Sequence, residues 1–443
     1  MVYKEVIVFW FRRDLRLNDN TGLFHALRNG KPVLPVFIFD TDILSKLEDS
    51  SDRRVDFIHQ AVTSLHHQLS LFGSGLTVFH GTPEKAFKKL SEIYRLSHVF
   101  TNHDYEPNAI KRDEGIADFL EQKGIVFISH KDQVVFEKNE VVKDDGKPYT
   151  VFTPYSRKWK QRLNSQSLVN YPSETLFKNF LRYQATIMPE LKELGFKKTD
   201  INFHLPELPQ ATLLQEYKSK RDFPSVKGTS RLSMHLRFGT ISIRTLAAFA
   251  IKHSETWLNE LIWREFYMMI LWHFPHVVNG SFKKEYDLIP WENNETLFRK
   301  WCEGKTGYPI VDAGMRELNT TGYMHNRVRM IVSSFLIKDL LIDWRWGEAY
   351  FAAKLNDFDL SANNGGWQWA AGSGCDAAPY FRIFNPYEQQ KKFDPEFKYI
   401  KKWVTEYGTP DYPTPVVDHA QARHRTLQVF KETLSPVKQA KLF

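Results

Sequence analysis

Short apolar runs alternate with amphipathic stretches along the first 130 residues of the chain. The apolar runs predict five buried strands, at residues 6–11, 35–39, 76–79, 98–102 and 125–128. The amphipathic stretches predict helices over residues 21–28, 56–71, 83–96 and 110–122. Because strands that alternate with helices form parallel sheets, we expect a doubly wound α/β domain over residues 1–130.

The pattern changes twice after this domain. Residues 131–203 are rich in lysine and polar side chains and have no steady period, which predicts a long interdomain linker. From residue 204 to residue 443, helical periods replace the strand signals and predict an all-α domain. The expected fold is therefore an α/β domain followed by a helical domain.

Residues 321–369 form the most unusual stretch of the helical part. Apolar residues from Val328 to Leu340 recur at three- and four-residue spacing and predict a helix with one face in a core. The neighbouring stripe carries polar and thioether side chains, those of Asn326, Arg329, Met330 and Ser333. Downstream, Asp357 or Asp359 is the expected partner of a partly buried arginine.

Four tryptophans crowd the same stretch, at positions 344, 346, 367 and 369. The sequence Asn-Asn-Gly-Gly at 363–366 predicts a loop through which backbone approaches a flat ligand. Each feature alone is also typical of an aromatic-rich helical core. Together they predict a cofactor pocket.

Two earlier segments of the helical part carry candidate chemistry. Residues 227–233, Lys-Gly-Thr-Ser-Arg-Leu-Ser, place a glycine and three hydroxyls before a helix, a pattern typical of a phosphate site or of an ordinary helix cap. On the following helix, one side carries a carboxylate, two aromatic rings and a guanidinium, from Glu260, Trp263, Arg264 and Tyr267. Such a carboxylate is either partly buried with a partner or part of a solvated face.

Composition narrows the class of protein. The formal net charge of +8 favours a polyanionic partner. The two cysteines, Cys302 and Cys375, lack a metal-ligand spacing and fit a reducing compartment, so no metal site is expected. The N-terminal pattern is unlike a signal peptide and no apolar run is long enough to cross a membrane, which predicts a cytoplasmic protein.

The predicted sheet has neither G-x-G-x-x-G nor a Walker sequence, so the common nucleotide fingerprints are absent from it. A ligand site at the carboxyl ends of the strands, near residues 11–14, Asp40 or 104–106, remains one interpretation. The other is a sheet that only supports the rest of the protein.

Several motifs along the chain together resemble one known family. They are Arg12-Arg13-Asp14-Leu15-Arg16 with Asp19-Asn20, and the segments 228–233, 260–267, 306–330 and 356–386. The two longest contain TGYPIVDAGMRELNTTGYMHNRVRM and ANNGGWQWAAGSGCDAAPYFRIFNP. Over essentially its whole length the chain resembles the photolyase/cryptochrome family, most closely the class I cyclobutane pyrimidine dimer photolyases of bacteria.

The resemblance implies an α/β domain able to carry an antenna chromophore, a connector, and a helical domain that holds a U-shaped FAD. It implies that the FAD phosphates and ribitol contact Tyr217, Thr229, Ser230, Leu232 and Ser233. The flavin ring and adenosine would be surrounded by Arg264, Asn326, Arg329, Asp357, Asp359 and Asn363.

The same resemblance implies roles around the substrate. Glu260, Trp263, Met330 and Trp369 would line the cavity for a flipped dimer, with Asn326 and Asn363 as further catalytic residues and with Trp263 and Trp369 also contacting DNA. The DNA backbone would be bound by Arg221, Arg327 and Arg382. Electrons that reduce the excited, oxidised flavin would pass along Trp367, Trp344 and Trp291.

The implied function is light-driven repair, in which reduced FAD donates an electron to split cis-syn pyrimidine dimers in UV-damaged DNA. The alternative is a blue-light photoreceptor without repair activity. Three features favour dimer repair: Asn363 in place of the aspartate of plant cryptochromes, Asn326 and Met330 in place of the histidines of (6-4) photolyases, and the short C-terminus at Phe443. The enzyme is expected to be a monomer. The antenna could be methenyltetrahydrofolate, a deazaflavin or a flavin, but Ala109 replaces the glutamate that follows Asn108 in folate-binding relatives.

Overall fold

The structure is a computed structural model and describes residues 5–183 and 187–435. Residues 1–4 of the expected α/β domain and 184–186 of the expected linker lie outside the described residues. So do residues 436–443, with the C-terminus used in the subfamily argument.

The chain divides into two compact units, and neither is a single continuous segment. The first unit comprises residues 1–140, 162–208 and 231–252, and the second comprises 141–161, 209–230 and 253–443. The domain limits expected from sequence, at residues 130 and 203, stay a prediction.

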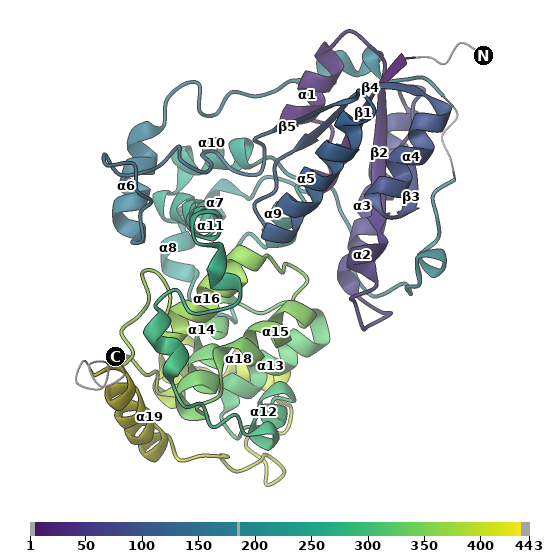
Figure 1. The fold of residues 1–443 in the computed structure, drawn as a ribbon. Coiled ribbons are helices and arrows are strands. Elements are labelled where there is room, and N and C mark those ends of the chain that lie inside the picture. Colours follow the sequence, from purple (N-terminus) through teal and green to yellow (C-terminus); the bar gives the residue numbers. More distant parts are fainter. Residues whose placement is uncertain (1–4, 184–186, 436–443) are drawn as a thin grey trace. The chain divides into compact units, whose positions relative to one another are not determined.

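The first unit contains a parallel five-stranded sheet with the strand order β3-β2-β1-β4-β5, as expected for a doubly wound domain (Figure 1). Its strands are β1 (Glu5–Phe11), β2 (Val33–Asp40), β3 (Thr77–Gly81), β4 (Arg95–Asn102) and β5 (Val126–His130). The connecting helices are α1 (Thr21–Arg28), α2 (Thr41–Leu44), α3 (Arg53–Ser70), α4 (Pro83–Ile93) and α5 (Pro107–Glu121). The unit also holds α9 (Ser233–Arg237), α10 (Ile243–His253) and two 3-10 turns, η1 (Ser173–Asn179) and η2 (Leu191–Leu194).

Helices cover both faces of this sheet. Successive side chains of a strand point to opposite faces, so each strand contributes to both contacts. Ile7 and Phe9 of β1 pack with α1 and α3 in one apolar cluster. Val8 and Trp10 of the same strand pack with α4 and α5 in another. Fully buried strands of this kind read as continuous apolar runs, which is why the sequence predicts them well.

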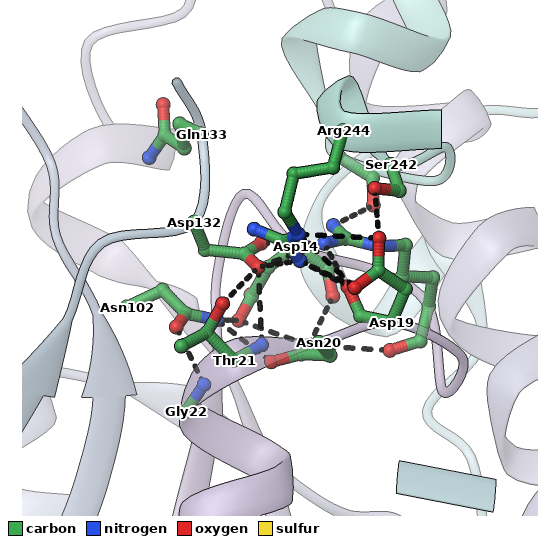
Figure 2. A network of polar contacts seen from close by, with 12 residues as sticks. Asp14, Asp19, Asn20, Thr21, Gly22, Asn102, Asp132, Gln133, Ser242 and Arg244 are labelled. Carbon is green, nitrogen blue, oxygen red and sulfur yellow. Dashed lines mark hydrogen bonds and ion pairs between the residues drawn. The ribbon is translucent and has the colours of Figure 1, made fainter. Parts of the chain in front are cut away.

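A buried polar network joins the loop after β1 to the ends of β4, β5 and the segment before α10 (Figure 2). Asp132 accepts hydrogen bonds from Arg16 at 2.7 Å and from Arg244 at 2.9 Å, and it also accepts from Thr21. Asp19 accepts from Arg244 at 2.9 Å and from Ser242. Although burial raises the pKa of Asp132, the two arginines lower it to about 2, so the carboxylate stays charged and paired.

This network accounts for the Arg-Arg-Asp-Leu-Arg motif near the N-terminus. Beyond the side-chain pairs, the amide of Leu15 donates to the carbonyl of Phe238 at 3.1 Å, and Arg16 donates to the carbonyl of Gly239 at 3.0 Å. The motif therefore ties the segment between α9 and α10 to the carboxyl edge of the sheet. The polar residues of this network therefore bind one another in the described structure.

The second unit is helical (Figure 1). Its α-helices are α6 (Phe152–Arg162), α7 (Ala211–Gln215), α8 (Tyr217–Lys220), α11 (Glu255–His273), α12 (Glu295–Cys302), α13 (Pro309–Thr321), α14 (Asn326–Ser334), α15 (Trp344–Lys354), α16 (Leu360–Ala371), α17 (Pro386–Phe393), α18 (Lys398–Trp403) and α19 (His419–Leu434). Two 3-10 turns, η3 (Pro275–Val278) and η4 (Lys284–Leu288), and a π-helical turn, η5 (Phe335–Asp339), complete it.

Two expectations about local structure are wrong. The expected linker contains α6, on which Phe152, Tyr155 and Trp159 are buried at helical spacing. The loop expected at residues 363–366 is part of α16, whose first turn is capped by Asp359. Gly365 fits there because a Cβ atom would lie 2.2 Å from the ring of Tyr267 on α11, so the glycine serves helix packing.

The predicted helix from 328 onward is confirmed as α14, but it ends in the π-helical turn η5, which the sequence does not predict. This turn brings Lys338 into the core, where its ammonium donates to the carbonyl of Ala371 at 3.0 Å and lies 3.8 Å from the ring centroid of Phe430. On the same turn Asp339 pairs with His419 of α19 at 2.5 Å. Helix α19 is thereby fixed to the core of the second unit.

No helix within residues 5–183 and 187–435 is long and apolar enough to cross a membrane. Over the same residues, no group of three metal-ligating side chains gathers at one point.

Candidate functional site

Three charged residues predicted for substrate or DNA binding lie in one chain of ion pairs in the second unit. Arg221, just after α8, pairs with Glu260 of α11, and its Nε lies 4.0 Å from Oδ1 of Asp222. Arg327 of α14 donates to that same oxygen at 2.9 Å and lies 4.3 Å from the ring centroid of Phe393. The chain of alternating charges thus runs from α11 to α14.

Burial gives Glu260 an unusual titration. Desolvation raises the pKa of its carboxyl above the ordinary value, and the adjacent Arg221 offsets only part of that rise. Arg221 itself has a raised pKa: burial lowers it, but Glu260 more than compensates. A carboxyl of this kind takes up a proton more readily than an exposed glutamate when the guanidinium moves away.

Trp263 stands one turn after Glu260 on α11 and is half-buried. Its ring stacks on Phe152 with centroids 3.7 Å apart and planes at 5°. Phe266 meets it edge-on at 5.6 Å, and Tyr267 lies tilted at 5.5 Å. Arg264, the next residue, is also half-buried on the same helix.

Arg329 is held by Asp357, one of the two carboxylates that the sequence offers as partners of a partly buried arginine. Its Nη2 donates to both carboxylate oxygens of Asp357, at 2.9 and 3.1 Å, and its Nε donates to the carbonyl of Met324 at 2.8 Å. Burial lowers the pKa of Arg329, but Asp357 raises it by more, so the guanidinium stays charged. The pair fixes a cation and a carboxylate beside the first turn of α14.

Helix α14 begins at Asn326 and carries Met330 one turn later. Asn326 is exposed, and its amide nitrogen lies 4.0 Å from the sulfur of Met330. The guanidinium of Arg327 lies 3.6 Å from that sulfur on another side. The structure therefore brings Met330 to the end of the charge chain that begins at Glu260.

Asn363 lies on α16 and is held by a residue that the sequence analysis does not identify. Its amide donates to the carboxylate of Glu348 at 2.8 Å and to the backbone carbonyl of Glu348 at 3.1 Å. Burial raises the pKa of Glu348, and the hydrogen bond from Asn363 opposes that rise. Asp359 stands at the start of the same helix and accepts from Ser361 at 2.5 Å.

The three tryptophans predicted for electron transfer belong to one apolar cluster in the second unit. Trp344 and Trp367 are each 2% exposed, whereas Trp291 is half-buried at the edge of the cluster. Two of the three rings are therefore buried, and the third lies at the edge of the cluster. Trp369 packs against the same cluster and is half-buried.

The residues predicted for the FAD phosphates divide between the units. Tyr217, Thr229 and Ser230 fall in the second unit, whereas Leu232 and Ser233 fall in the first, at the start of α9. Gly228 lies against α8 so closely that a Cβ atom would be 2.6 Å from the carbonyl oxygen of Lys220. The half-buried hydroxyls of Thr229 and Ser230 follow this close approach.

These donors fit the cofactor that the motifs imply. Hydroxyls and main-chain amides suit a diphosphate, while the amide of Asn363 and the Arg329–Asp357 pair suit a ring that both donates and accepts hydrogen bonds. Arg382 is exposed in the loop after α16 and lies 5.8 Å from the ring centroid of Phe384, apart from the charge chain.

Sequence reasoning misses three residues that hold the predicted ones: Asp222, Glu348 and Phe152. Asp222 directly follows Arg221, and a carboxylate next to a predicted DNA-binding arginine is a signal that could have identified it. Phe152 shares helical spacing with Tyr155 and Trp159, a signal hidden by the polar composition of its segment. Glu348 has no such signal, because nothing in the sequence indicates that α15 and α16 pack together.

Two protein-family models match the chain. One is described as the FAD binding domain of DNA photolyase and matches residues 257–410, and the other is described as DNA photolyase and matches residues 7–174. A deoxyribodipyrimidine photo-lyase from Halobacterium salinarum is 36% identical, over 96% of this chain and 98% of that protein.

Two solved structures are also similar over nearly the whole chain. A bacterial class III photolyase from Agrobacterium tumefaciens has a TM-score of 0.86 and 31% identity, covering 98% of each chain. An archaeal photolyase from Sulfolobus tokodaii, determined with two FAD molecules, has a TM-score of 0.82 and 36% identity, covering 96% of this chain and 100% of that one.

Proposed function

The chain belongs to the photolyase/cryptochrome family, and from this premise we propose that it is a deoxyribodipyrimidine photo-lyase that repairs DNA with FAD and light. Its substrate is DNA that contains cis-syn cyclobutane pyrimidine dimers. Reduced FAD, when bound and excited by blue or near-ultraviolet light, supplies the electron that splits the dimer. The observation that carries the proposal is Glu260 beside Trp263 on one helix, joined through arginines to Met330.

The substrate has to leave the duplex to reach these residues. Photolyases are among the enzymes that act on nucleotides flipped out of the base stack, and a damaged site flips more cheaply than an intact one. The half-buried faces of Trp263 and Trp369 offer apolar walls against which two fused bases can pack. We therefore assign the dimer cavity to Glu260, Trp263, Asn326, Met330 and Trp369.

DNA binding would exchange partners along the charge chain. Without DNA, the carboxylates of Glu260 and Asp222 neutralise Arg221 and Arg327. Phosphates of the bound strand would take these two guanidiniums, and the edge of a dimer base would take Glu260. Because burial raises its pKa, Glu260 released from Arg221 would take up a proton more readily than an exposed glutamate, and the protonated form would donate to the base. Arg382 would contact the backbone separately, from its exposed loop.

We assign the cofactor to the residues that the motifs imply. Tyr217, Thr229, Ser230, Leu232 and Ser233 would hold the phosphates and ribitol. The ring and adenosine would be bound by Arg264, Asn326, Arg329, Asp357, Asp359 and Asn363. Glu348 accepts both hydrogen bonds that the amide nitrogen of Asn363 donates, so the amide oxygen of Asn363, a hydrogen-bond acceptor, is oriented before the cofactor binds.

Trp367, Trp344 and Trp291 would pass electrons from solvent to the oxidised cofactor. Their shared apolar cluster keeps water away from the two inner rings, and the half-buried Trp291 can be reduced again from outside. This route serves only to prepare the reduced cofactor. Repair itself would run between the cofactor and the dimer cavity.

The second chromophore and the working context complete the proposal. Ala109 is buried in the first turn of α5, where folate-binding relatives carry a glutamate, so a flavin or deazaflavin antenna is the first to test. Heat release of the bound chromophores and their chromatography would identify it. We further propose that the enzyme works as a monomer in the cytoplasm, on nucleoid DNA.

Damage-selective binding tests this proposal directly. The affinities of a thymine-dimer duplex and of its undamaged twin are measured by fluorescence polarisation at two salt concentrations, because phosphate contacts weaken as salt rises. The wild-type protein should prefer the damaged duplex. Trp263→Ala should lose about 5- to 100-fold in affinity for the dimer while retaining FAD, since one stacking surface is removed.

The control is Trp346→Ala, which removes another half-buried tryptophan to which no role is assigned. It should leave the damage preference unchanged. Equal binding of both duplexes by wild-type protein would contradict repair and favour the photoreceptor alternative. Loss of FAD together with dimer affinity in Trp263→Ala would remove the role assigned to that ring.

A further inference from the structure

Trp263, which is predicted to line the substrate cavity, makes a close aromatic contact with Phe152. The ring of Phe152 lies 3.7 Å from that of Trp263, centroid to centroid, and nearly parallel to it. Such an arrangement covers one face of the indole. Phe152 lies in the segment 141–161 of the second unit, ahead of the residues matched by the FAD-binding family model.

Three further contacts hold Phe152 and its helix in place. The backbone amide of Phe152 donates to Oδ2 of Asp376 at 3.2 Å, in the loop after α16. Phe266 meets the ring edge-on at 5.9 Å. Further along α6, the indole nitrogen of Trp159 donates to the buried carboxylate of Glu265, so the helix is bound to α11. Phe152 is therefore a fixed surface.

Phe152 is buried but more exposed than the other two aromatic residues on its face of α6. Tyr155 and Trp159 of the same helix are 1% exposed and fill the contact between α6 and α11. Phe152 is 9% exposed and faces the half-buried Trp263 instead. Its ring thus covers one face of Trp263.

A fixed stacking partner has a consequence for substrate binding. The indole cannot rotate without losing the stack, so its remaining face and edge keep one orientation in the free protein. A dimer then meets a wall that is already ordered, and binding loses less side-chain freedom. Aromatic pairs of this geometry are stabilised beyond their buried area.

We propose that Phe152 is a positioning residue for dimer recognition, acting through Trp263. The proposal rests on the proposed function, since it assumes that Trp263 contacts the dimer. It extends the substrate site to α6, a helix in the segment expected from sequence to be a linker. Phe152 itself does not touch the reacting bases.

The test compares Phe152→Leu, which keeps an apolar side chain but removes the ring, with Phe152→Tyr, which keeps the ring. Dimer duplex affinity, undamaged duplex affinity, FAD content and repair rate at saturating dimer are measured for each full-length holoenzyme. Leucine should weaken dimer affinity by about 2- to 10-fold. It should leave undamaged DNA binding, FAD content and the saturated rate unchanged, and tyrosine should restore dimer affinity.

Two comparisons separate positioning from general packing. In the Trp263→Ala background, the leucine substitution should change dimer affinity by less than about 1.5-fold, because its effect passes through the indole. Phe298→Leu, in a second aromatic contact where Phe298 meets Trp346 at 5.2 Å, should not change dimer affinity. The proposal would be overturned if Phe152→Leu weakened dimer affinity as much in the Trp263→Ala background as in the wild-type protein. It would also be overturned if Phe152→Leu alone left dimer affinity unchanged.

The outcomes also distinguish this inference from the function on which it rests. Wild-type protein that binds damaged and undamaged DNA equally would overturn both. Wild-type protein with a clear preference that Phe152→Leu retains in full would overturn the positioning role alone. Loss of FAD from Phe152→Leu, with no recovery in Phe152→Tyr, would show that the residue serves the fold and would overturn the proposal as well.

Discussion

Replacing Gly365 with alanine should disturb the site through the packing of two helices. Gly365 lies on α16 against the ring of Tyr267 on α11. A Cβ atom built on Gly365 would lie 2.2 and 2.3 Å from two ring carbons. Because carbon atoms are comfortable at about 3.5 Å or more, one helix has to move by roughly 1 Å.

The neighbouring residue provides a matched control. A Cβ atom on Gly366 would meet no atom within 4 Å, and both glycines lie in the same helix. Alanine at either position gains about 1 kcal/mol of helix propensity, so this term cancels in the comparison. Overpacking costs about 1 to 3 kcal/mol at position 365 only, and the two variants should differ in stability by that amount.

The assay follows the site as well as the fold. Guanidinium unfolding by circular dichroism gives the stability difference, and flavin fluorescence during heating gives the temperature of FAD release. Gly366→Ala should match or exceed the wild type in both. Gly365→Ala should unfold at a lower guanidinium concentration than Gly366→Ala. It should also release FAD at a lower temperature, since α16 carries Asn363. Equal behaviour of the two variants would refute the packing argument.

Two further substitutions test the electron route and the buried cation. Trp291→Phe should slow photoreduction of oxidised FAD, because a phenyl ring is harder to oxidise than an indole, while repair by chemically reduced enzyme stays at the wild-type rate; a loss of repair in the reduced enzyme would show that the two routes are not separate. Burial lowers the pKa of Lys338 from 10.5 in the unfolded chain to about 7 in the folded protein. The stability that depends on a neutral Lys338 is therefore fully present above pH 10.5, and it is lost as the pH falls through 7. Lys338→Met should therefore increase the free energy of unfolding more at pH 7 than at pH 10, with a difference of up to about 3 kcal/mol. An equal gain at both pH values would contradict the lowered pKa.

Much of the fold follows from the sequence because its signals are local. Helix α1 begins and ends where predicted, since Asn20 caps it and its apolar residues keep a helical period. The five strands are likewise found, because a sheet covered on both faces needs continuous apolar runs. The pair of Arg329 with Asp357 follows only in part, because the sequence offers both Asp357 and Asp359 as partners of a partly buried arginine.

The errors arise where tertiary contacts override local preference. Two consecutive glycines usually weaken a helix, yet Gly365 lies inside α16 because Tyr267 packs against it. The π-helical turn at η5 is set by the contact with α19, through Thr426 and Lys338, and has no local signal. Glu348 and Phe152 are likewise known only once the helices that carry them are packed.

The most direct test of the central claim is repair itself. A thymine-dimer oligonucleotide is mixed with the chemically reduced protein, illuminated with blue light or kept dark, and analysed for restored thymines. We predict restoration in the illuminated sample alone. An unchanged dimer after illumination, with FAD bound and reduced, would contradict the account and leave the family fold without its repair activity.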